Sequence, residues 1–387
     1  MERQRQPAMH LADGLRRLVR DISQPDPLPG HGLSGITCGE TRLISFDDDG
    51  VRFCQHGVEK LVAENTFDEV TWLLLNGELP GEEYLADIQA IVSDSAVIDN
   101  GAAEMLERIP LNVRPLDLFP LSISLVSFFD PMPPDQKAEA TRHRVWRLLA
   151  QLPVMLAAGL GHRLDHGRID DGELSATTWA GRLLYCLRNE ASIPTPAEDA
   201  AMNAVMICCC LTEMRPACFA ARFAGSTVNH IVAALQAAST LFVSQLNNDP
   251  FQWTSDLLRS LSGPSAAEAW WRRREGQPMP FGFSSENSDP RPAILQTVCR
   301  GLLGSHDRIR IEASACRLEK IQAAQQLFPT TDWVAARVLT LLNIPSDRHA
   351  LVIAMSRLVG WAAQAIEQQK AGVSLLPALR YETCDDE

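Results

Sequence analysis

The segment "PFGFSSENSDPRPA", residues 280–293, contains residue types that could hold an anion beside a reacting group. It ends in Asp289-Pro290-Arg291, where the proline fixes a turn that presents a guanidinium. A guanidinium binds carboxylates through paired, charge-assisted hydrogen bonds. Where a proton-transfer residue would complete such a site, the segment offers a phenylalanine followed by two serines. The segment therefore indicates an anion pocket that lacks an obvious group for proton transfer.

The composition limits the class of protein. The chain has 387 residues, of which 46% are hydrophobic and 21% charged, as in a globular protein large enough for two or three domains. Its formal net charge of −13 argues against nucleic acid or an anionic membrane as a partner, because both need a basic surface. No charged segment leads into an apolar run at the N-terminus, and no stretch reaches the roughly 18 apolar residues of a membrane span. These patterns predict a cytoplasmic protein without a secretory leader.

The ten cysteines lie mostly within apolar helical patterns such as "VMICCCLTEM". This placement predicts buried free thiols in a reducing compartment rather than disulfides. Three adjacent residues on one helix point in different directions, so Cys208, Cys209 and Cys210 would make a poor metal site. No metal is predicted.

The elements that must position these residues are mostly helices. From about residue 58, apolar residues recur at helical spacing in segments separated by breaks such as "SGPS" and "NIPSD". Thr66, with Glu69 three residues later, is typical of a helix start. Upstream, "TRLISF" and "VRFCQ" flank "DDDG" and predict a hairpin. Residues 1–32 are a polar lead-in with one short helical pattern. We expect a mainly α fold with a small β-hairpin near the N-terminus.

The stretch "GLSGITCGETRLISFDDDGVRFCQHGVEKLVAENTFDEVTWLLLNGELP" resembles the N-terminal region of bacterial-type citrate and 2-methylcitrate synthases. The similarity continues in the family's order through "RPLDLFPLSISLVSFFDP", "LTEMRPACFAARFAGST", "PFGFSSENSDPRPA" and "SRLVGWAAQAIEQ", and covers residues 33 to about 381. The resemblance implies a large helical domain, residues 33–222 and 328–387, with a smaller helical domain, residues 223–327, inserted in it. It also implies a homodimer whose chemistry lies in the cleft between the domains.

The resemblance also implies roles for several charged residues. The family's "NVDFYSG" segment matches "TTDWVAA", which places the catalytic base on Asp332. Residue type alone favours a helix N-cap there, since Asp332 precedes an apolar helix. Arg291 and Arg357 match the arginines that hold the carboxylates of oxaloacetate, although each could also serve in a structural salt bridge. The family's subunit-crossing arginine falls on Leu376, with Arg380 close by.

Three histidine positions of the family hold other residues. The enolate-stabilising histidine falls on Val243, and the histidine that polarises the ketone falls on Phe283. The histidine of the "HE.NAST" motif, which helps to bind oxaloacetate, falls on Thr212 in "TEMRPAC". The chain's nine histidines all lie elsewhere, and His230 is more than three helical turns before Val243. We therefore expect citrate formation to be lost.

The loop that serves coenzyme A in the family becomes Ser284, Ser285 and Glu286. The carboxylate of Glu286 would repel a phosphate group rather than bind it. Acetyl-CoA or another acyl-CoA is therefore expected as a co-substrate only if the protein is active, and no other cofactor is predicted.

Three functions remain open from the sequence. The first is a catalytically degenerate citrate synthase-like protein with a structural or regulatory role, as a homodimer or as a heteromer with a citrate synthase paralogue. The second is a divergent enzyme that condenses an acyl-CoA with a 2-oxo acid or processes a thioester. It would reuse Asp332, Arg291 and Arg357, with Ser284 or Glu286 as a new participant. The third is a sensor that binds a dicarboxylate through Arg291 and Arg357 without converting it.

Overall fold

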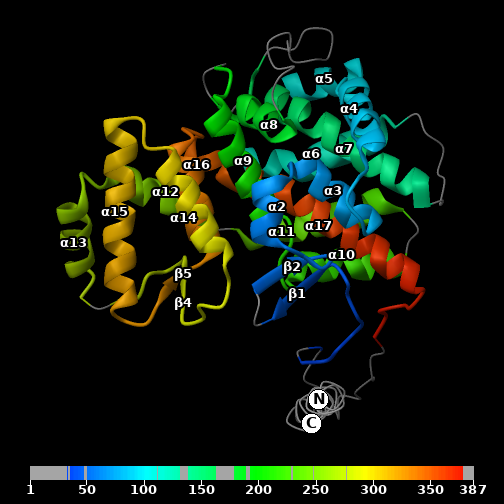
Figure 1. The fold of residues 1–387 in the computed structure, drawn as a ribbon. Coiled ribbons are helices and arrows are strands. Elements are labelled where there is room, and N and C mark those ends of the chain that lie inside the picture. Colours follow the sequence, from blue (N-terminus) through cyan, green and yellow to red (C-terminus); the bar gives the residue numbers. More distant parts are fainter. Residues whose placement is uncertain are drawn as a thin grey trace, which may run out of the picture. The chain divides into compact units, whose positions relative to one another are not determined.

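The computed structural model divides the chain into two compact units, Met1–Thr41 and Arg42–Glu387. The predicted lead-in and its helical pattern lie outside the described residues. Every element below belongs to the second unit (Figure 1). The structure describes residues 33, 35–47, 50–110, 112–130, 138–162, 178–188, 192–227, 230–246, 248–275 and 277–377.

The described part of the second unit is mainly helical, which confirms the predicted fold class. The first half contains α2 (Val58–Glu64), α3 (Phe67–Asn76), α4 (Glu82–Ser95), α5 (Asn100–Glu107), η1 (Pro115–Asp117), α6 (Leu118–Phe128), α7 (Ala138–Gly159) and α8 (Trp179–Leu187). The second half contains α9 (Pro196–Cys209), α10 (Pro216–Thr227), α11 (Ile231–Gln245), α12 (Pro250–Ser260), α13 (Pro264–Arg272), α14 (Arg291–Gly301), α15 (His306–Ala323), α16 (Thr331–Leu341), η3 (Ser346–Arg348) and α17 (His349–Ala371).

The predicted hairpin is present. Strand β1 (Ile44–Asp47) pairs antiparallel with β2 (Gly50–Phe53), and the short β3 (His56–Gly57) extends the sheet beyond β2. Val51 and Phe53 alternate along β2 and are both buried, so one face of the hairpin packs on the core. The turn at residues 48–49 lies outside the described residues.

The start of α3 confirms the predicted helix signal. The Thr66 side chain accepts a hydrogen bond from the Glu69 backbone, while the Glu69 carboxylate accepts one from the Thr66 backbone. This capping box satisfies two backbone N–H groups that the helix itself leaves unpaired. The helix ends at Asn76, where Gly77 adopts a left-handed conformation with φ +94°.

Helix α17 forms the centre of the core. It packs against α10, α11, α9 and α3, and nearly all of its residues are buried. A Cβ atom on Gly360 would overlap the carbonyl oxygen of Cys210, so glycine allows the end of α9 to approach α17. By length and composition, Ser346–Ala371 could cross a membrane, contrary to the expectation from sequence, but its apolar window is buried inside the fold. A helix that is apolar all round is also what a protein core requires.

Helices α12, α14 and α15 pack against α16, and α13 packs against α15 (Figure 1). Arg337 of α16 is only 1% exposed and pairs with Glu312 and Glu319 of α15 at 3.0 and 2.7 Å. The Trp333 indole also donates to Glu319 at 3.0 Å. These bonds fix the first two turns of α16 against α15.

The predicted domain limits at residues 222 and 328 stay a prediction.

Candidate functional site

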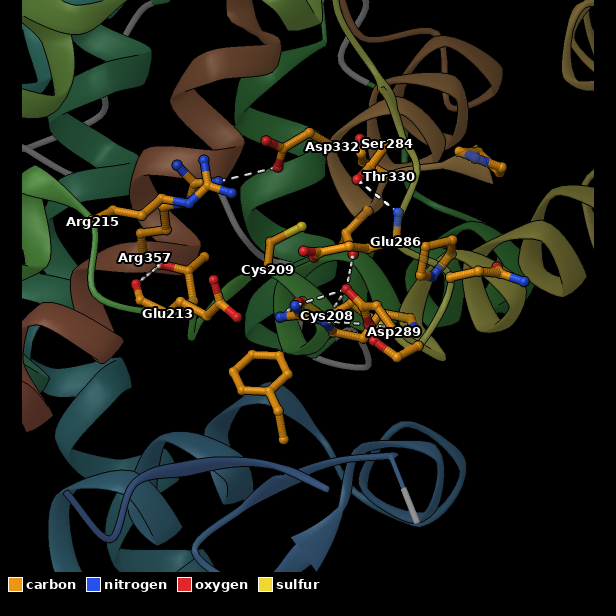
Figure 2. A pocket seen from close by; sticks show the side chains of 18 residues that line it. Cys208, Cys209, Glu213, Arg215, Ser284, Glu286, Asp289, Thr330, Asp332 and Arg357 are labelled. Atoms are coloured by element: carbon orange, nitrogen blue, oxygen red, sulfur yellow. Dashed lines mark hydrogen bonds and ion pairs between the residues drawn. The ribbon is translucent and has the colours of Figure 1, made fainter. Parts of the chain in front are cut away.

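A cavity of about 200 Å³ lies where several chain segments meet (Figure 2). It receives the end of α9, the segment before α10, the loop before α14 and the first turn of α16. The lining residues are Phe46, Cys208, Cys209, Thr212, Glu213, Arg215, Ser284, Glu286, Asn287, Ser288, Asp289, Arg291, Pro292, Pro329, Thr330, Thr331, Asp332 and Arg357. Segments more than 300 residues apart in sequence therefore supply one site.

One wall of the cavity is built on Arg291, the first residue of α14. Its Nε and Nη2 atoms donate to the two carboxylate oxygens of Asp289 at 2.9 and 2.8 Å, and its Nη1 donates to the Leu211 carbonyl at 2.8 Å. The Phe46 ring lies over the guanidinium, 5.7 Å from it, so the hairpin covers this wall. We call Arg291 with Asp289 the closed wall, because the guanidinium uses its donors inside the protein.

The pairing of Arg291 with Asp289 determines the charge states of both side chains. Burial alone would raise the pKa of Asp289, but hydrogen bonds and charge from Arg291 outweigh it and hold the pKa below its usual value. Burial would likewise lower the pKa of Arg291, and its bonds to Asp289 raise it instead. Thr331 of α16 also donates to the Asp289 carboxylate, at 3.0 Å. Both groups are therefore charged at neutral pH, and the pair ties α14 to α16.

The opposite wall is built on Arg357 of α17. Its Nη2 donates to Asp332 Oδ1 at 3.1 Å, and its guanidinium lies 5.2 Å from the centre of the Phe242 ring. The Arg357 residue is 8% exposed, whereas the Asp332 side chain is 32% exposed. The Nε atom of Arg357 is buried and has no hydrogen-bond partner among the described residues. Arg357 is therefore held in place with part of its donor set unused.

Arg215 contributes a third guanidinium, which sequence reasoning missed. It precedes α10, is exposed, and lines the cavity without an ion pair among the described residues. Figure 2 shows Arg215 and Arg357 with their guanidinium groups directed toward the Asp332 side of the cavity. The signal was present in the motif comparison, since "TEMRPAC" carries this arginine where "HE.NAST" has an asparagine. We call Arg215 with Arg357 the open wall.

Asp332 does not cap α16, as its residue type had suggested. The helix is capped by Thr330, whose side chain accepts from the Trp333 backbone at 3.4 Å, and Asp332 lies within the first turn. A carboxylate in the first turn is stabilised by the positive end of the helix dipole. Because Thr330 does the capping, the Asp332 carboxylate is left to face the cavity and Arg357 (Figure 2).

The loop that carries Phe283 is fixed to α16. Strand β4 (Phe283–Ser284) pairs with β5 (Phe328–Pro329), and the Phe283 ring packs on Trp333 with ring centres 4.9 Å apart. Gly282 has φ +89°, and a Cβ atom there would overlap Trp333. Only glycine therefore fits this turn. Phe283 is consequently a packing residue against the first turn of α16 and is not among the residues that line the cavity.

The structure brings together six of the residues predicted for the site. Asp332, Arg291, Arg357, Thr212, Ser284 and Glu286 all line the cavity, whereas Val243, Phe283 and Ser285 are absent from its lining. Val243 is 8% exposed and belongs to the apolar core near the end of α11. The Thr212 hydroxyl donates to the neighbouring Glu213 carbonyl at 3.1 Å. Leu376 is 66% exposed, and Arg380 lies outside the described residues.

The thiols at the cavity are unreactive. The described cysteines are free, and Cys208 and Cys209 are fully or almost fully buried, as predicted. Burial raises the pKa of Cys209 to about 12 and that of Cys208 well above its usual value. Neither thiol is expected to ionise near neutral pH, which disfavours a role as nucleophile.

The cavity combines guanidinium groups with carboxylates and hydroxyls, and no histidine appears among its described lining residues. Guanidinium groups can bind the carboxylate of a small organic acid. Asp332 could accept a proton, but the lining offers no imidazole to donate a hydrogen bond to an enolate or a ketone oxygen. The geometry supports anion binding more strongly than proton-transfer catalysis.

Comparison with known proteins identifies the family. Residues 32–377 match the family described as "Citrate synthase, C-terminal domain". Citrate synthase 2 of Bacillus subtilis is 24% identical over 91% of this chain and 95% of its own length, and the 2-methylcitrate synthase of Shewanella oneidensis is 24% identical over 93% and 96%.

Solved structures show the same fold. The citrate synthase of Pyrobaculum aerophilum superposes with a TM-score of 0.79 at 19% identity, covering 92% of this chain and 93% of its own. The citrate synthase of Thermoplasma acidophilum, solved with carboxymethyl coenzyme A and oxaloacetate, gives 0.76 at 19% identity over 92% and 96%. The family match spans most of the chain, and the expected resemblance is thereby confirmed: this chain belongs to the citrate synthase family.

Proposed function

We propose that this protein is a catalytically degenerate member of the citrate synthase family that binds a small carboxylate without condensing it with acetyl-CoA. The observation that carries the proposal is the make-up of the cavity, whose described lining includes three arginines and Asp332 but no histidine. The positions expected to hold the two catalytic histidines hold Val243, in the apolar core, and Phe283, whose ring packs at a tilt on Trp333.

The physical consequence concerns the enolate. The methyl protons of acetyl-CoA are very weakly acidic, so a carboxylate base needs a hydrogen-bond donor at the thioester oxygen to stabilise the charge that develops. Loss of one such donor typically lowers the rate by about 10²–10³. Valine and phenylalanine side chains have no donor, so both expected donors are missing at once.

A thiol-release assay tests this proposal. Purified protein is incubated with acetyl-CoA and oxaloacetate, and free CoA thiol is followed beside an active citrate synthase at equal concentration. We expect no release above background. Turnover within about a hundredfold of the active enzyme would overturn the proposal. A Val243→His, Phe283→His double variant that gains turnover would support the assignment of these two positions.

The proposed role is structural or regulatory, in a homodimer or in a heteromer with a citrate synthase paralogue. Support comes from α6, where Leu121 and Phe128 are 39% and 76% exposed and lie with Ser124 on one face. Exposed apolar side chains grouped on one face are typical of an interaction surface.

Size-exclusion chromatography with light scattering measures whether α6 joins two chains. The Phe128→Ser variant should elute as a smaller species than the wild type at equal concentration, alone or mixed with an active citrate synthase. Lys60→Ser, which changes an exposed residue of α2 that is distant from α6 in the sequence, serves as the control. Unchanged oligomers in the Phe128 variant would exclude α6 as the contact.

A further inference from the structure

We propose that Arg215 and Arg357 together bind one carboxylate group of the ligand, and that Arg215 is the residue that determines which organic acids are accepted. The inference rests on the proposed function, because it assumes that the cavity is retained for anion binding. It adds Arg215, a residue that the family resemblance did not supply.

The first step concerns the unused donors of Arg357. A guanidinium has five N–H donors in a planar fork. One nitrogen of Arg357 donates to Asp332, its Nε has no described partner, and no described acceptor pairs with its Nη1. The residue is 8% exposed and lines the cavity. The Nε atom is enclosed by the protein, so the donors left for a ligand oxygen in the cavity are those on the terminal nitrogens of the guanidinium.

The second step concerns Arg215. Its guanidinium extends into the same cavity and lies on the same side as that of Arg357 (Figure 2). Two like charges directed at the single Asp332 carboxylate are incompletely neutralised. Arg215 also immediately precedes α10, whose first turn contains no acidic residue. The positive end of that helix dipole therefore adds to the attraction for an anion.

The third step limits the ligand by charge. The cavity lining holds three arginines and four carboxylates, those of Glu213, Glu286, Asp289 and Asp332. The closed wall and the Asp332–Arg357 bridge neutralise two of each. Arg215 then remains with Glu213 and Glu286, neither of which has an ion pair among the described residues, so the lining carries a net charge of −1 and Arg215 is its one unpaired cation. A ligand with many negative charges would be repelled by these two side chains.

The fourth step limits the ligand by size. A cavity of about 200 Å³ is smaller than the sites that hold drug-sized molecules, which begin near 300 Å³. Together, size and charge favour a small organic acid with one or two carboxylates over a tricarboxylate. The ligand class is therefore a small mono- or dicarboxylate.

Isothermal titration calorimetry provides the test, with oxaloacetate, citrate and inorganic phosphate as probes. We expect oxaloacetate to bind at least tenfold more tightly than citrate, and inorganic phosphate serves as the anion without a carboxylate. Arg215→Gln should weaken oxaloacetate binding about ten- to hundredfold, the cost of one charge-assisted hydrogen-bonding group. Arg273→Gln, at an exposed arginine outside the cavity, makes the same charge change and should alter affinity less than twofold. Circular dichroism melts verify that each variant is folded.

The outcomes separate the two proposals. If the wild type binds none of the three probes, both the retained anion site and this inference fail. If the wild type binds oxaloacetate and Arg357→Gln abolishes binding while Arg215→Gln changes it less than twofold, the anion site stands and the role of Arg215 is overturned. Citrate binding as tight as that of oxaloacetate would overturn the ligand class.

Discussion

The two walls of the cavity use arginine in different ways. Arg291 and Arg357 are almost equally buried, at 7% and 8% exposure. Arg291 directs its guanidinium at a nearby carboxylate and at backbone carbonyls, so its donors are satisfied within the protein. Arg357 makes one bond to a carboxylate and leaves donors unused. Arg291 and Arg357 are therefore equally buried but differ in how their donors are used. The donors of the closed wall stabilise the fold, and those of the open wall are available to a ligand.

The largest expected effect comes from disturbing both walls together. Gly360→Ala on α17 would place a methyl group on the Cys210 carbonyl, at the end of the helix that carries the site cysteines. We expect a loss of more than about 3 kcal/mol in unfolding free energy, measured by denaturant titration, because backbone atoms must move apart. Gly301→Ala, which has open space around it, is the control and should be neutral or slightly stabilising. Equal stability of the two variants would contradict this packing argument.

The comparison of the walls is tested most directly by replacing each arginine with alanine. Arg291→Ala should cost about 3 kcal/mol, because it leaves Asp289 without its buried partner. Arg357→Ala should cost about 1 kcal/mol, because it removes a single bond to Asp332, whereas Arg291 bonds both oxygens of Asp289 and the Leu211 carbonyl. Exposure does not separate the two carboxylates, whose side chains are 31% and 32% exposed. Oxaloacetate binding should show the reverse order, with the larger loss in Arg357→Ala. A stability order opposite to this one would show that the walls have been assigned wrongly.

The smallest effect is a change in pH dependence at the closed wall. The folded-state pKa of Asp289 lies below the unfolded value of 3.8, so the unfolded chain takes up the proton first as the pH falls. Stabilisation by Asp289 is therefore present above about pH 3.8 and is lost as the pH falls through the folded-state pKa. In thermal melts, the stability gap between the wild type and Asp289→Asn should narrow from pH 6 to pH 3. Glu59→Gln, at an exposed carboxylate, controls for general acid effects; a gap that stays constant would argue against the Arg291 pairing.

Local sequence signals predicted the parts of the fold that local physics decides. The start of α3 followed from Thr66 and Glu69, because capping depends on residues within one turn. The N-cap of α16 was not predicted correctly, since both Thr330 and Asp332 are residue types that cap helices. Which of the two residues caps α16 depends on the backbone conformation of the segment that leads into the helix.

The family resemblance predicted which residues meet at the site. It did not predict the contacts that these residues make with segments distant in the sequence. Asp332 and Arg357 were expected at one site, and they meet there. The bond from Arg291 to the Leu211 carbonyl joins residues 80 positions apart, and no local pattern encodes it. Arg215 was missed because an exposed arginine before a helix resembles any surface residue, although it replaces the asparagine of "HE.NAST"; the shared cavity shows that the replacement lies at the site.

The closed wall has a consequence for how such proteins change over generations. A lineage that abandoned catalysis would still be selected to keep Arg291 and Asp289. Loss of either residue leaves the charge of the other without its partner inside the protein, which destabilises the fold. Selection for a foldable chain can therefore preserve a motif long after its chemistry has stopped being useful. An arginine such as Arg215, which stabilises little and faces the cavity, is freer to vary. Under the proposed function, the residue type at position 215 would therefore follow the ligand more closely than Arg291 or Asp289 does.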